Sequence, residues 1–111
     1  MIEKTVLDYL NDRITSVPSF METPEDEPDE YIRIEKTGSS VENQIERATF
    51  AIQSYARSLY RAAEINEMVK EAMDSIYEIA DVFTAYRNTD YNFTDEETKH
   101  YRYQAVYQIV Y

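Results

Sequence analysis

Between Ser58 and Tyr77 the chain contains no glycine or proline, and its apolar side chains recur at helical spacing. They fall three, four or one residues apart, on one stripe of a helix: Ala62, Ile65, Val69, Ala72, Met73 and Ile76. Ser58 suits the N-cap, because its hydroxyl can accept a hydrogen bond from a free N–H of the first turn. A long amphipathic helix must cover an apolar surface, so the rest of the chain has to supply a second layer.

Strand patterns supply that layer. The last eleven residues, Tyr101–Tyr111, alternate with period two, which predicts a strand with one apolar and aromatic face. Further strands are expected at Tyr31–Thr37, Ile45–Ala56 and Val82–Phe93, with a short one near Ser19–Glu22. Helix is the alternative for the first half of Ile45–Ala56. We expect the tyrosine face of the last strand to pack beneath a helix. A subunit contact through Tyr103 and Tyr107 is the alternative, because tyrosine is enriched at interfaces.

The remaining segments complete one domain over residues 1–111, a usual domain length. An amphipathic pattern over residues 2–14 predicts a first helix, which Pro18 follows. The only glycine, Gly38, is expected in a turn over Thr37–Ser40 with a positive φ. Residues 94–99 read as a polar hairpin loop.

The predicted fold is α+β, a two-layer sandwich. Two helices cover one face of a four- to five-stranded, mainly antiparallel and possibly mixed sheet. Any parallel pair is expected between the strands on either side of the long helix, joined by a right-handed crossover.

Acidic side chains cluster in two loops, residues 23–30 and residues 94–99. The chain carries 22 acidic and 11 basic side chains, a net charge of −11. Residues 23–30 form an acidic, proline-bounded loop that is expected to be solvated and that holds five carboxylates: Glu25, Asp26, Glu27, Asp29 and Glu30. Arg57 and Arg61 are candidates for interface contacts with such a loop. This net negative charge disfavours tight binding to nucleic acid, because it repels the phosphates.

The residues offer little for catalysis. With no cysteine, thiolate chemistry and cysteine–zinc sites are excluded, and His100 is the only histidine. One glycine cannot build a phosphate-binding loop, and the acidic loop lacks the central glycine of a calcium loop. We therefore predict no enzymatic activity, no cofactor and no specific metal site. No segment has the apolar length that spans a bilayer, so no membrane partner is expected.

The order of these segments resembles the tail-terminator, or tail-completion, proteins of long-tailed bacteriophages and prophages. The similar stretches are Met21–Ser40, Val41–Ser58 and Tyr101–Tyr111. The two predicted helices fall where that family would place them, so the likeness covers nearly the whole chain. Within them, Glu35-Lys36-Thr37-Gly38, Asn43–Ala48, Ala51–Ala56 and Arg102–Tyr107 carry the likeness. The polar stretch Asn88–Lys99 departs from the pattern.

The resemblance implies a structural virion protein. Members form a ring, commonly a hexamer, on the last ring of major tail protein; it stops tube growth and offers a joining surface to head-completion or neck proteins. The implied location is the virion tail, with assembly in the host cytoplasm. DNA would only pass through the channel. In such a ring, the loop carboxylates Glu25, Asp26, Glu27, Asp29 and Glu30 are expected at the ring surface or the channel lumen.

Three other interpretations stay open. An acidic protein can imitate DNA and inhibit a DNA-binding enzyme, although such a mimic needs carboxylates spaced along an extended surface. A neck or head-closure protein lies close to the first interpretation. A small hydrolase would depend on His100, or on a serine and a lysine.

Overall fold

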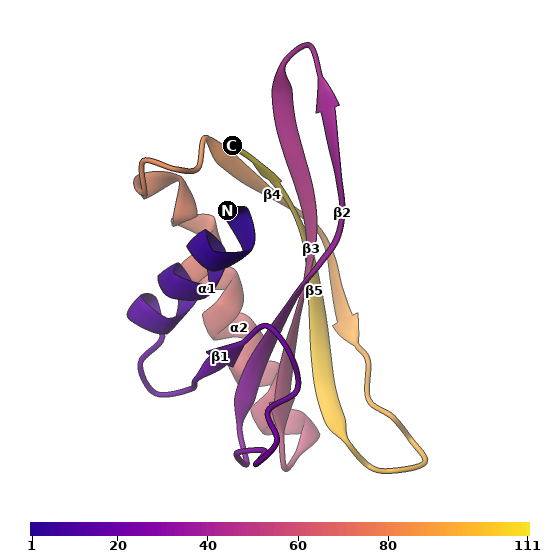
Figure 1. Cartoon of the computed structure of the whole chain (residues 1–111). Coiled ribbons are helices and arrows are strands. Elements are labelled where there is room, and N and C mark those ends of the chain that lie inside the picture. The colour runs from indigo at the N-terminus through magenta and orange to yellow at the C-terminus, as the bar shows by residue number, and fades with distance from the viewer.

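The computed structural model describes all 111 residues and has the predicted order of elements. The helices are α1 (Ile2–Arg13), α2 (Leu59–Asp74) and the short 3-10 helix η1 (Ile76–Glu78). The strands are β1 (Ser19–Phe20), β2 (Tyr31–Glu42), β3 (Ile45–Ala56), β4 (Thr84–Asn92) and β5 (Tyr101–Val110). The α+β sandwich is confirmed, with both helices on the same face of the sheet (Figure 1).

The five strands form one mixed sheet in the order β1-β2-β3-β5-β4. The only parallel pair is β1–β2, and the other neighbours are antiparallel. The predicted parallel pairing across α2 is therefore wrong. Strands β3 and β4 do run in the same direction, but β5 lies between them and pairs with both. Sequence patterns predict where each strand lies along the chain. Which strands become neighbours in the sheet depends on contacts between segments that are far apart in the sequence.

The core lies between the helices and the sheet. Val6 and Leu10 of α1 and Ile65 and Val69 of α2 are fully buried. Burying a side chain of this size stabilises the fold by roughly 1.5–3 kcal/mol. The Tyr9 hydroxyl donates to the Ala72 carbonyl at 2.6 Å and thus joins the two helices.

The sequence predicted the residue at which α2 begins, but it did not show where the helix ends. Ser58 is the N-cap, and its hydroxyl accepts a hydrogen bond from the Arg61 N–H at 3.1 Å, as expected. The helix ends at Asp74, within the segment Ser58–Tyr77 that has no glycine or proline, and η1 follows after Ser75. The tighter turn keeps Ile76 in the core, so the apolar stripe is buried throughout.

Strands β2 and β3 form a long hairpin that extends beyond the rest of the sheet (Figure 1). All residues from Glu35 to Glu46 are exposed, and we call this segment the arm. Its turn is formed by Asn43 and Gln44, whose φ angles are 51° and 64°. Two adjacent left-handed residues are typical of a type I′ hairpin turn, whose twist matches that of the strands.

The predicted turn at Gly38 is therefore wrong. Gly38 lies inside β2, has no positive φ, and follows a β-bulge between Lys36 and Gly38. The strand continues past the glycine because β3 pairs with it as far as Glu42. The strand predicted over Ile45–Ala56 is confirmed with the same bounds.

Candidate functional site

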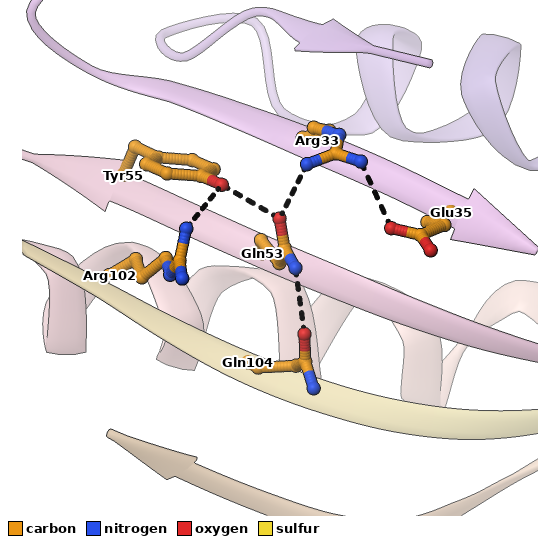
Figure 2. A network of polar contacts seen from close by, with 6 residues as sticks. All are labelled: Arg33, Glu35, Gln53, Tyr55, Arg102 and Gln104. Carbon is orange, nitrogen blue, oxygen red and sulfur yellow. Dashed lines mark hydrogen bonds and ion pairs between the residues drawn. The ribbon is translucent and has the colours of Figure 1, made fainter. Parts of the chain in front are cut away.

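No helix covers the second face of the sheet, and a polar network lies across it (Figure 2). Gln53 of β3 is at its centre, and its amide donates to the Gln104 side-chain oxygen at 2.8 Å. The Gln53 oxygen accepts from the Tyr55 hydroxyl at 2.8 Å and from Arg33 at 3.3 Å. Gln104 in turn donates to the Tyr91 hydroxyl at 2.6 Å. The network thus connects β2, β3, β5 and β4 in one row.

An aromatic stack continues this face toward the start of β2. The Tyr31 and Tyr55 rings are stacked with centroids 4.5 Å apart, and the His100 ring lies 4.6 Å from Tyr55. Arg102 donates to the Tyr55 hydroxyl at 3.2 Å, and its guanidinium lies 4.6 Å over the Phe93 ring. Cations over aromatic faces are stabilised by the ring quadrupole. The only histidine is thus engaged in packing against an aromatic ring.

The acidic loop, residues 23–30, is exposed as predicted, and part of it is bound to its own chain. Asp29 pairs with Arg57 at 2.7 Å. Glu30 makes a two-point contact with Arg61 at 2.7 and 3.1 Å, and this hydrogen bonding raises the pKa of Arg61. Within the chain, the two arginines hold the end of this loop against the start of α2. Their contact with a neighbouring subunit stays a prediction.

Glu27 accepts a hydrogen bond from the Tyr31 hydroxyl at 2.8 Å. Burial of the Tyr31 ring, reinforced by this carboxylate, raises the pKa of Tyr31. Glu25 and Asp26 are exposed and form no ion pair. The free negative charge of the loop is therefore at its tip.

The two tyrosines proposed as contact residues lie on the helix side of β5. Tyr107 is 1% exposed and belongs to the core, and Tyr103 is partly buried against that core. Tyr107 is therefore a packing residue and offers no surface to a neighbour. This arrangement confirms the expectation that the tyrosine face packs beneath a helix.

A second aromatic surface lies along β4 and was not predicted. Tyr86, Tyr91 and Phe93 are 55%, 40% and 40% exposed. The alternating pattern of β5 did indicate that Arg102 and Gln104 face away from the core. The neighbours of these side chains depend on the strand register, which the sequence does not show.

The surface has shallow depressions. The largest, of about 650 Å³, lies beside α1 and is lined by Lys4, Asp8, Tyr9, Asp12 and Asp81 among others. A depression of about 460 Å³ adjoins the aromatic stack between Glu27, Arg57, Lys99 and His100. No three His, Asp or Glu side chains gather closely enough to hold a metal ion. Neither helix has the length and apolar character that crossing a membrane requires.

The fold and this surface define the class: a small α+β sandwich whose sheet has one uncovered, hydrogen-bonded face. No protein-family model and no curated protein matches the chain.

Proposed function

We propose that this chain is a structural virion subunit of the tail-terminator type, which assembles with copies of itself into a ring, commonly a hexamer. The ring would cap the tail tube, stop its growth and present a joining surface to head-completion proteins. The sequence resemblance motivates this role. The projecting arm is the structural observation that supports it best.

The arm is more than a short loop between strands. Its residues from Glu35 to Glu46 are exposed, and the molecule measures 44 Å along its longest axis against 26 and 25 Å across. A two-stranded hairpin is marginally stable in water without a surface to pack on. Val41 and Ile45 near its tip are 67% and 44% exposed. A neighbouring subunit would cover these side chains and hold the arm in place.

The charge distribution also supports a DNA channel without tight DNA binding. The acidic loop and the Asp95–Glu97 loop place carboxylates at exposed positions. Like charges repel phosphates, so DNA that passes such surfaces finds no sites that retain it. By contrast, a DNA mimic needs carboxylates along an extended surface, whereas the uncovered sheet face carries Arg33, Arg47 and Arg102. We therefore favour the ring over the inhibitor.

The test is the mass of the protein in solution over a wide concentration range, with electron microscopy of any rings. A matched variant shortens the arm by deleting the paired residues Ser40–Val41 and Glu46–Arg47, which keeps the turn and the alternation of side chains. We expect rings from the natural chain and weaker assembly from the short-arm variant. A control that keeps the arm at full length carries Asp12→Asn, at an exposed carboxylate of α1. A natural chain that stays monomeric up to its solubility limit would contradict the proposal.

A further inference from the structure

We propose that neighbouring copies bind edge to edge: the acidic loop at the β1–β2 edge of one chain docks on the β4 edge of the next. This inference rests on the proposed ring and names the surfaces that would close it. It is carried by the different chemistry of the two edges of the sheet.

The β4 edge is aromatic and carries one arginine, Arg87, that forms no ion pair. No strand pairs with the outer side of β4. Tyr86, Tyr91 and Phe93 are exposed along or just after it, and Arg87 within the strand is exposed as well. Arg87 forms no ion pair, although the chain has twice as many acidic as basic side chains. Aromatic residues and arginine are the types enriched at protein interfaces.

The opposite edge has the complementary charge. Strand β1 pairs only with Ile32 and Arg33, so the rest of the outer side of β2 has no strand partner. The acidic loop connects β1 to β2 and therefore belongs to this edge. Its bonds to Tyr31, Arg57 and Arg61 anchor one end of the loop and leave Glu25 and Asp26 free. The loop thus presents carboxylates that have no partner within the chain.

The positions of these edges favour a ring over a twofold dimer. A twofold axis brings the same patch of both copies together, which would place like charges opposite each other. A head-to-tail contact instead joins unlike edges and leaves one free edge on each copy, so addition continues until the ring closes. The acidic residues Asp95–Glu97 lie just beyond the end of β4. Their repulsion would restrict the docked loop to the strand itself.

Side chains, rather than continuous backbone pairing, would carry the contact. Strand β4 has a bulge between Arg87 and Thr89, and β2 has one between Lys36 and Gly38. Bulges in edge strands interrupt the regular row of donors and acceptors that an added strand needs. Charge reversal should therefore change the affinity strongly.

The experiment uses two charge-reversal variants of the full chain. The first, Glu25→Lys with Asp26→Lys, makes the loop basic; the second, Arg87→Glu, makes the β4 edge acidic. We expect each alone to self-associate more weakly by on the order of tenfold or more, because like charges then meet. A mixture of the two, and one chain with all three changes, should recover the ring, since opposite charges meet again. Tyr86→Ala should also weaken assembly, and mixing it with a charge-reversal variant should not restore the ring.

The control reverses two other exposed carboxylates without ion pairs, Asp12→Lys with Glu71→Lys, on the helix layer. It should assemble like the natural chain. Equal weakening by this control, or a mixture that does not recover, would overturn the edge contact. If the natural chain and both charge variants form the same rings, the edge assignment fails while the ring function stands. If the natural chain forms no assembly at all, the proposed function fails and the edge contact with it.

Discussion

Gln53 and Gln104 lie directly opposite each other on β3 and β5, and their side-chain amides are joined by a 2.8 Å hydrogen bond on the uncovered face. The Gln53 side-chain oxygen also accepts hydrogen bonds from Tyr55 and Arg33, so this side chain is hydrogen-bonded to three residues. Both glutamines are largely buried, at 5% and 9% exposed. A buried polar group that loses its partner retains the cost of its desolvation.

Gln53→Ala should therefore lower the free energy of unfolding by about 1–3 kcal/mol, measured by urea denaturation. Gln104→Ala should cost less, because the Gln104 side chain forms hydrogen bonds only with Gln53 and Tyr91. The double variant should show a coupling energy of about 0.5 kcal/mol or more. Strictly additive losses would indicate that the two amides do not interact in solution.

Gly38→Ala should stabilise the protein slightly, by up to about 0.5–1 kcal/mol, since glycine weakens a strand interior. A Cβ atom at this position would meet nothing within 4 Å. Asn43→Ala is the matched change at the true turn, and it should destabilise the arm by about 1 kcal/mol because alanine disfavours a positive φ. Hydrogen exchange of the arm amides reports both effects. A destabilised Gly38→Ala protein would show that the backbone there needs glycine.

Asp90 links β4 to α2 and should make the fold sensitive to acid. It accepts hydrogen bonds from Asn66 at 2.9 Å and Lys70 at 3.1 Å. Burial alone would raise the pKa of Asp90, but these bonds outweigh it and lower that pKa. The resulting stability is present above the unfolded-state pKa of about 3.9 and is lost as the pH falls through the lower folded-state pKa.

Asp90→Asn should thus cost about 1–2 kcal/mol of unfolding free energy near neutral pH. The natural chain and the variant should converge in denaturation curves measured at strongly acidic pH. Asp12→Asn, at an exposed carboxylate without an ion pair, is the control and should change little at neutral pH. A difference that persists unchanged at low pH would rule out the charge of Asp90 as its cause.

Tyr107 should make the fold sensitive to alkali. Burial raises the pKa of Tyr107 to about 12, and the charge of Asp74 adds to the rise. Ionisation therefore favours unfolding: the stability is complete below the unfolded-state pKa of about 10 and is lost as the pH approaches 12. Its hydroxyl is buried without a hydrogen-bond partner.

Tyr107→Phe should leave the stability at neutral pH unchanged or raise it by about 1 kcal/mol, because it removes an unsatisfied polar atom. The same change should reduce the loss of stability between pH 10 and 12, as measured by thermal unfolding. Tyr86→Phe, at an exposed ring, is the control. An unaltered alkaline transition in Tyr107→Phe would assign that transition to other groups.

Local patterns in the sequence determined the elements and the buried face of each one. The stripe from Ala62 to Ile76 specified α2, and the alternation after Tyr101 specified β5, because helix and strand periods are properties of neighbouring residues. The exposure of the acidic loop followed from its prolines and carboxylates in the same way.

Only the tertiary structure decided which strands are neighbours and which side chains meet. In the folded chain, β5 lies between β3 and β4, and Gln53 lies opposite Gln104. Arg57 and Arg61 pair with the acidic loop of their own chain. The hairpin turn is formed by Asn43 and Gln44, whereas the sequence predicted it at Gly38. The physical reason is that strand register and ion pairing depend on the packing of segments far apart in the chain, which no local period records.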